Sequence, residues 1–176
     1  MVERLTRING YISKLLLLLA AAGLFAMTLI IGWQVYARYV LNASPSWSEQ
    51  LSLLLMIWYA LLAAAAGFHE GFHIRIVALQ AASSEKRARI MRIAAEIIVI
   101  LCGVMMVIWG IDLARIISSH VIPSLGISRT WAYAPLPIAG ALIVLFSGTR
   151  LAGEITQPGF TAEDEIDSVA APVGDA

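Results

Sequence analysis

Four long stretches of the chain are almost free of charged side chains. They cover residues 15–35, 51–68, 93–111 and 131–149, and Glu96 is the single charged residue within them. A helix needs about 20 apolar residues to cross a hydrocarbon core of about 30 Å. A backbone exposed to lipid must also satisfy its own hydrogen bonds, which favours helices over open strands. The pattern therefore predicts an all-α integral membrane protein with four transmembrane helices.

Composition supports this prediction and limits the domain organisation. The 176 residues are 60% hydrophobic and only 14% charged, whereas about a quarter of the residues of a soluble domain are charged. Four spans and their connections fill residues 1–152, so we expect one membrane domain and no separate globular domain. Residues 153–176 are acidic and poor in apolar residues, which predicts a disordered cytoplasmic tail. The first apolar run continues to Val35, so we expect a retained helix rather than a cleaved signal peptide.

The Lys and Arg residues are distributed unevenly over the two sides of the predicted membrane domain. Nine lie in the N-terminal segment, in the 69–92 connection or at the end of the fourth span, and three lie on the opposite side. Positively charged loops favour the cytoplasm, which places both termini there. The zero net charge thus conceals an asymmetry that reports topology, and nothing in it indicates nucleic-acid binding. The nine are Arg4, Arg7, Lys14, Arg75, Lys86, Arg87, Arg89, Arg92 and Arg150, and the three are Arg38, Arg115 and Arg129.

The connection between the second and third spans predicts a short interfacial helix. Its apolar residues suit a segment lying in the membrane plane, and they are Ile74, Ile76, Val77 and Leu79. Ser83 or Ser84 is then placed to cap a following helix with Glu85 in its first turn. The basic run 86–92 faces either anionic lipid headgroups or solvent, and the sequence leaves both open.

On the opposite side, the chain turns between the first two spans. Ser46 and Glu49 have the spacing of a capping box, and Ser44 as cap with Pro45 at the first helical position is an equal alternative. Arg38 and Glu49 flank the turn, where they either pair or serve only as topology and snorkelling residues. Trp33, Trp47 and Trp131 are expected at this interface as an aromatic belt.

Three smaller features of the spans also carry predictions. Asp112 and Arg115 are three residues apart near the outer end of the third span, which favours an ion pair. Cys102 is expected to be a small packing residue. Small residues at 63–67 and at Gly140 and Ala141 permit close helix packing.

The residues around the outer turn also carry a family resemblance. The chain resembles the DctQ-like family, the small membrane subunits of tripartite ATP-independent periplasmic (TRAP) transporters, over about residues 10–152. The matching residues are Gly32-Trp33-Gln34-Val35, Arg38-Tyr39-Val40-Leu41-Asn42, Ser46-Trp47-Ser48-Glu49, Ile57-Trp58, Gly71, His73-Ile74, Tyr133-Ala134 and Pro137.

The resemblance implies a scaffold and docking role in a bacterial inner membrane. In that family a large membrane subunit holds the Na⁺ and substrate sites, and a periplasmic binding protein delivers an organic acid. Both are expected partners, together with membrane lipids, and no catalytic, metal or cofactor site is expected in this chain. The residues expected at the partner interface or structural corner are Trp33, Arg38, Asn42, Trp47, Glu49, Trp58 and His73.

Reasoning from the residues alone agrees with a scaffold, because ionisable residues within spans mark ion or substrate paths and Glu96 is the only one. The alternative is a membrane anchor for haem or quinone that uses His69, His73 and His120. His69 and His73 have a possible ligand spacing, but His69 and His120 are expected on opposite sides of the membrane. A small exporter that acts as a homo-oligomer is a third reading.

Overall fold

The computed structural model describes residues 2–43, 45–69 and 85–156. Four of its helices are long and apolar enough to cross a membrane, as the hydrophobic pattern predicts. The long helices are α1 (Val2–Tyr39), α2 (Ser46–His69), α4 (Glu85–Ile116) and α6 (Pro135–Thr156), and the short elements are β1 (Val121–Ile122), β2 (Ile127–Ser128) and α5 (Thr130–Tyr133).

Three of the long helices extend well past the predicted spans. The predicted spans contain almost no charged residues and end near the first ones. A helix, however, continues through charged residues where it leaves the hydrocarbon. α1 has 38 residues, which gives a length of about 57 Å at 1.5 Å per residue. That exceeds a hydrocarbon core of about 30 Å, so α1 either tilts or continues beyond it. α6 likewise continues to Thr156, past the predicted domain end at residue 152.

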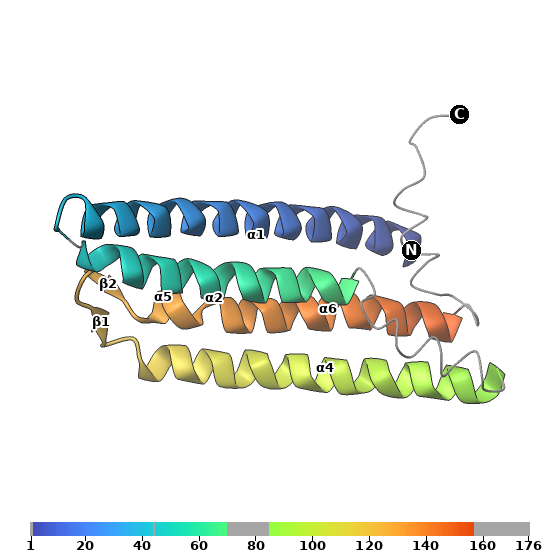
Figure 1. Ribbon diagram of the computed structural model, residues 1–176. Coiled ribbons are helices and arrows are strands. Elements are labelled where there is room, and N and C mark those ends of the chain that lie inside the picture. The colour runs from blue at the N-terminus through green and yellow to red at the C-terminus, as the bar shows by residue number, and fades with distance from the viewer. Residues whose placement is uncertain (1, 44, 70–84, 157–176) are drawn as a thin grey trace, which may run out of the picture.

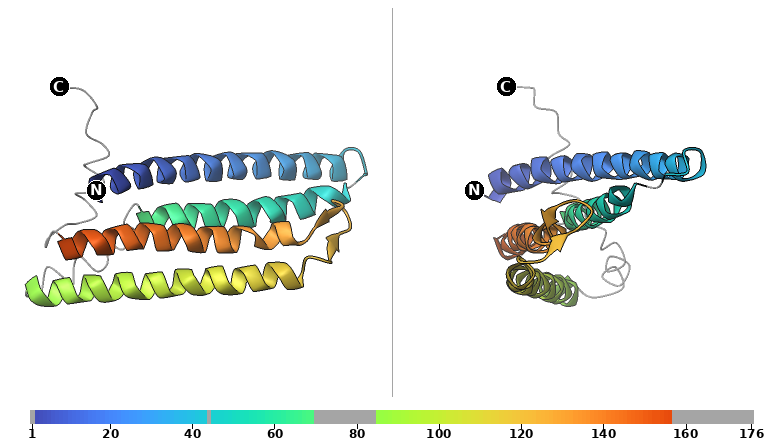
Figure 2. Two further views of the ribbon diagram at one scale, coloured as in Figure 1. Left: turned by 180° about the vertical axis from the view of Figure 1, so that it is seen from behind. Right: turned by 90° about the vertical axis from the view of Figure 1, so that its left-hand side faces the viewer.

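The four long helices lie roughly parallel in the order α1, α2, α6, α4 (Figures 1 and 2). α1 packs mainly on α2, α4 packs on α6, and α2 and α6 join the two pairs. The arrangement is a layer of helices, with α1 and α4 at its two edges. The start of α1 and the ends of α2 and α6 lie together with the start of α4, at what we call the termini end. The opposite end is called the hairpin end.

Small residues let the helices at the centre of the layer approach closely. Ala65 of α2 and Ala139 of α6 are fully buried and share one cluster with Ile143. A Cβ atom added to Gly140 of α6 would lie 2.7 Å from the carbonyl oxygen of Gly103 in α4. Without a hydrophobic force between helices in lipid, such backbone approach is a main source of association. The predicted role of Gly140 is confirmed.

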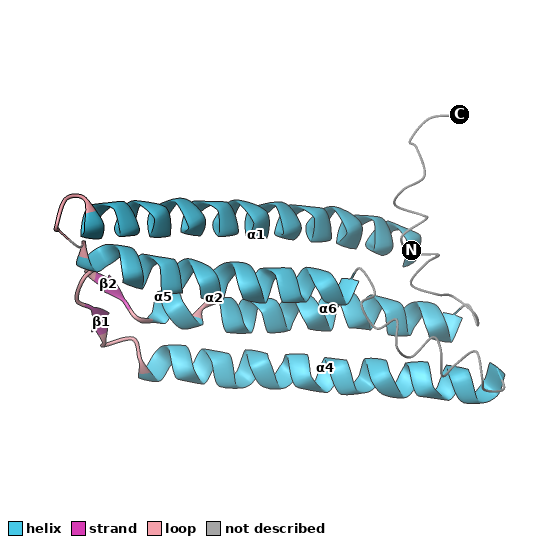
Figure 3. Cartoon of the chain, in the orientation of Figure 1, coloured by secondary structure: helices cyan, strands magenta, loops and turns pink. Residues whose placement is uncertain are grey.

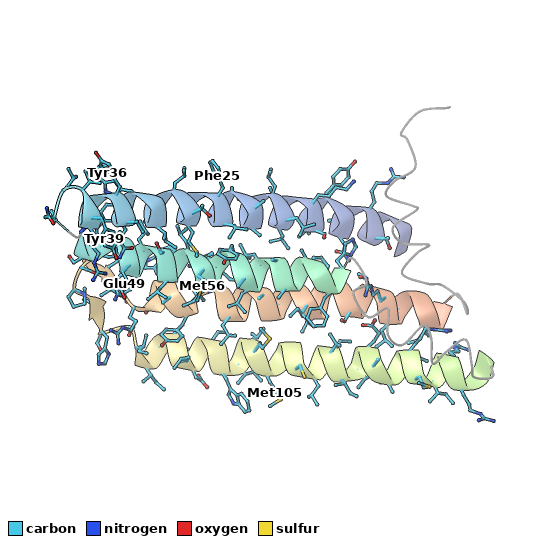
Figure 4. All side chains as sticks on the ribbon, in the orientation of Figure 1. Phe25, Tyr36, Tyr39, Glu49, Met56 and Met105 are labelled. Carbon is cyan, nitrogen blue, oxygen red and sulfur yellow. The ribbon has the colours of Figure 1, made fainter. Side chains whose placement is uncertain are left out.

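Large apolar side chains cover the outside of the layer. Phe25 of α1 is 67% exposed and Ile98 of α4 is 61% exposed. Figure 4 shows Phe25 and Tyr36 projecting from α1 away from the other helices, and Met105 projecting from the opposite edge. This surface suits lipid or an apolar partner and would be unfavourable in water. Cys102 is exposed as well, so the prediction that it packs inside the chain is wrong.

The connection between α4 and α5 contains a β-hairpin that the sequence reading did not include (Figure 3). Val121 pairs with Ser128 and Ile122 with Ile127 in antiparallel register. Gly126 turns the chain with φ +67°. α5 then ends before Pro135, where α6 begins, so the fourth apolar stretch is divided between two helices.

Two predictions concern the connection between α2 and α4. The interfacial helix would fall within residues 70–84 and lies outside the described residues, as do Ser83, Ser84 and His73. α4 begins at Glu85, so this residue stands in the first turn of a helix as predicted. That helix is continuous with the third span, so Glu96 lies about three turns after the beginning of α4.

Candidate functional site

The predicted corner lies at the hairpin end, where α1 turns into α2. Asn42 adopts φ +51°, and the Ala43 N–H bonds back to the Ala37 carbonyl oxygen at 3.1 Å. Asn is one of the few residues that tolerate this left-handed conformation. Asn42, one of the residues that carry the family resemblance, thus has a local structural role. It ends α1 and lets the chain reverse direction.

The first turn of α2 is closed by a contact that the sequence analysis did not predict. The Ser48 hydroxyl donates to the Pro45 carbonyl oxygen at 2.8 Å, and Ser48 is fully buried. Ser46 is already helical, so it does not stand at the cap position that the capping box requires. No bond between Ser46 and Glu49 occurs among the described residues, and Ser44 lies outside them.

Arg38 and Glu49 are both exposed. The ion pairs shown for the described part of the chain join Asp112 to Arg115 at 3.8 Å and Glu96 to Arg150 at 4.0 Å. The first of these was predicted from its spacing. A pair between Arg38 and Glu49 is not among them, so the structure leaves the two charges as separate exposed groups. Figure 4 shows Glu49 and Tyr39 at this end of the molecule.

Tryptophans gather around the same end. Trp33 lies 5.9 Å from Tyr36, measured between ring centroids, and both side chains are about half exposed. Trp58 of α2 donates from Nε1 to the Trp131 carbonyl oxygen at 2.9 Å, and the two rings are 6.4 Å apart. Trp58 therefore joins α2 to α5, while Trp33 and Trp47 remain available on the surface.

A second polar cluster lies at the termini end, and sequence reasoning missed it. Arg150 of α6 donates from Nη2 to the carbonyl oxygen of His69, the last residue of α2, and its Nη1 faces the Glu96 carboxylate. The neighbouring Thr149 accepts a hydrogen bond from Asn9 Nδ2 at 2.7 Å. The signal available in the sequence was the one intramembrane carboxylate, which in lipid calls for a partner.

His69 is buried in this cluster. Its side chain is 3% exposed, and its ring lies 5.1 Å from that of Phe146. His120 lies beyond the end of α4 at the hairpin end, so the two histidines are separated by the length of the layer. That placement does not suit a haem shared between them.

The described residues form no group of three or more His, Cys, Asp or Glu side chains suited to a metal ion. What they offer is a layer of apolar helices, tied by polar groups at one end and by tryptophans and a turn at the other. This arrangement is that of a multi-pass membrane protein.

Comparison with known proteins identifies the family. The family model described as "Tripartite ATP-independent periplasmic transporters, DctQ component" matches residues 27–157. The chain belongs to this family and is a TRAP transporter small permease subunit, not an enzyme. This finding sets aside the membrane anchor of a haem or quinone enzyme.

Curated relatives agree. The chain is 27% identical over 119 residues to the sialic acid TRAP transporter small permease protein SiaQ of Vibrio cholerae, which covers 68% of this chain and 69% of that one. It is 25% identical over 145 residues, 82% and 90% of the two chains, to a putative TRAP transporter small permease protein of Haemophilus influenzae. A third similarity, 26% over 134 residues, is to the sialic acid TRAP transporter permease protein SiaT of Haemophilus influenzae and covers 76% of this chain but only 22% of that protein.

Proposed function

We propose that this chain is the scaffold and docking subunit of a Na⁺-coupled TRAP transporter for organic acids. A large membrane subunit would hold the Na⁺ and substrate sites, and a periplasmic binding protein would deliver the acid. The chain would lie in a bacterial inner membrane with both termini in the cytoplasm. Sialic acid, which the names of SiaQ and SiaT carry, is one member of the proposed substrate class.

The observation that carries the proposal is the distribution of charge in the layer. Within the described helices, Glu96, the one charged residue inside the predicted spans, faces Arg150 at the end of the fourth span. A carboxylate that already faces a guanidinium is poorly placed to take up Na⁺ as well, and the buried clusters of the layer consist of apolar side chains. A transport path is therefore better placed in a partner.

The similarity to SiaT also supports a small scaffold subunit that works beside a large transport subunit. A segment like this chain makes up 22% of that permease protein, so in that protein it is part of a much longer polypeptide. A small subunit that works beside a large one fits this relationship. The exposed apolar surface of α1 and α4 offers room for such a partner.

Assembly tests the proposal. A tagged copy of this chain should co-purify with the large membrane subunit encoded with it, and deleting the chain should abolish uptake of the acid while the binding protein is still secreted. The control is a strain that lacks the binding protein, in which the two membrane subunits should still co-purify. Uptake at the wild-type rate without this chain would contradict the proposal.

A further inference from the structure

Two consecutive residues of α6 contact all three other long helices. Thr149 accepts the hydrogen bond from Asn9 of α1 at 2.7 Å. Arg150 donates to the carbonyl oxygen of His69 at the end of α2 and faces Glu96 of α4 at 4.0 Å. The four helices therefore meet at one point of the layer, through polar groups.

These groups are removed from water to an unusual degree for polar side chains. Asn9 is 1% exposed, and the side chains of Arg150 and Glu96 are 12% and 24% exposed. The Thr149 hydroxyl donates to the Phe146 carbonyl oxygen at 2.8 Å, which leaves its lone pairs free to accept from Asn9. Both hydroxyl functions are thus used.

Arg150 is suited to hold two helices at once. Its guanidinium presents a planar fork of donors, and the two groups that it meets are both negative. One is a carboxylate, and the other is the carbonyl end of α2, where the helix dipole favours a cation. A lysine has a single point charge and does not reproduce this two-sided geometry.

The rest of the layer gives these contacts particular weight. Helices in lipid gain no hydrophobic energy by associating, so packing of small residues and interhelical hydrogen bonds set their arrangement. α2 and α4 lie on different sides of α6 (Figure 2), and Arg150 is bonded to one and faces the other. The position of α2 relative to α4 at the termini end then depends on this residue.

We propose that Asn9, His69, Glu96, Thr149 and Arg150 form an interhelical lock, in which Arg150 is a positioning residue for transport. The lock holds the helices at the termini end in one arrangement and thereby keeps the surface offered to the large membrane subunit in a fixed shape. The last step rests on the proposed function, whereas the lock itself does not.

The lock is tested first in the chain alone, in lipid. Cys102 is replaced by alanine, and spin labels are placed at Ala64 of α2 and Ala94 of α4, both exposed. Arg150→Ala should broaden the distance distribution between the labels, and the milder changes Arg150→Lys and Glu96→Gln should broaden it less. Arg115→Ala is the matched control, because it removes an arginine from an exposed ion pair at the other end, and it should change nothing. A sharp, unshifted distribution in Arg150→Ala contradicts the lock.

Exchanging the charges separates the two sides of Arg150. In the double variant Glu96→Arg with Arg150→Glu, the α4–α6 pair is restored with opposite sign, but a carboxylate now faces the carbonyl end of α2. With a label on Leu145, distances from α6 to α4 should recover while those from α6 to α2 stay broad. Recovery of both would show that the bond to His69 positions nothing.

Transport tests the positioning role in the assembled system. With the large membrane subunit and the binding protein present, Arg150→Ala should lower the uptake rate at least about tenfold, as expected for breaking a largely buried charged pair, while Arg115→Ala stays within about twofold. Broadened distances with normal uptake would reduce the lock to fold stability and overturn the positioning role. Failure of the proposed function has a different signature, which is uptake by the wild-type chain alone.

Discussion

At the residue scale, Asn42 is the clearest case of a position where the backbone conformation restricts which residues fit. Its φ of +51° costs a β-branched residue about 1–2 kcal/mol more than it costs glycine. We predict that Asn42→Val lowers the stability of the purified protein by about that amount, whereas Asn42→Gly is nearly neutral. Thermal unfolding in detergent measures both. Equal stability of the two variants would show that the turn does not depend on this conformation.

Arg38 and Glu49 belong to the same corner but face outward separately. If each contacts a partner, Arg38→Ala and Glu49→Ala should each weaken co-purification of the large subunit while membrane insertion stays intact. Since the structure shows no ion pair between them, the double variant should cost the sum of the two single changes. A double variant no worse than either single one would mean that the charges do pair in the complex, and wild-type assembly in all three would remove the corner as a site.

Local spacing explains which of the charged contacts the sequence predicted. Asp112 and Arg115 are one helical turn apart, so their pairing follows from helix geometry. Glu96 and Arg150 come from different helices, and no periodicity within one helix brings them together. The sequence indicated only that an intramembrane carboxylate needs a partner, and the fold supplied Arg150.

At the scale of elements, glycines determine how closely α4 and α6 pack. A Cβ atom at position 140 would meet the Gly103 carbonyl oxygen and the Met106 Cβ atom below 3.0 Å, while nothing lies within 4 Å of one at position 148. We predict that Gly140→Ala destabilises the protein by about 1–3 kcal/mol through overpacking. Gly148→Ala, in the same helix, is the matched control and should be neutral or slightly stabilising. Thermal unfolding of the two variants, measured side by side, would refute the close α4–α6 contact if they behaved alike.

The hairpin could not have been predicted from periodicity. Its strands have two residues each, too few for an alternating pattern to appear. What orders it is a set of hydroxyl contacts. The Ser128 hydroxyl lies 3.0 Å from the Ser118 carbonyl oxygen, and the Thr130 hydroxyl donates to the Ala114 carbonyl oxygen at 3.2 Å. These bonds use carbonyl groups at and beyond the end of α4. They form only after the chain has folded back onto α4, so no local sequence pattern indicates them.

At the scale of the whole molecule, the number of spans followed directly from hydropathy, but the order of helices in the layer did not. Apolar residues lie on all sides of α1, so no amphipathic stripe marks its neighbour. The contacts between helices come instead from alanines, glycines and polar groups. The sequence indicates that small residues can be contact points, but it does not show which residues of other helices they contact.

The charge asymmetry predicts the orientation of the layer. With Cys102 replaced, single cysteines at Ser124 and at Ser44 should react with a membrane-impermeant reagent in intact cells, and cysteines at Ser84 and Asp167 should react only after the cells are opened. The structure places the start of α1 and the end of α6 at one end, so they share one side of the membrane. Labelling at Ser84 in intact cells would reverse the predicted orientation.

The central claim is that this chain supports transport without carrying it out, and uptake by proteoliposomes tests it most directly. Vesicles with an inward Na⁺ gradient are prepared with this chain alone, with the large membrane subunit alone, or with both, and the binding protein loaded with the labelled acid is added outside. We expect uptake only when both membrane subunits are present. Na⁺-driven uptake by vesicles that contain this chain alone would contradict it.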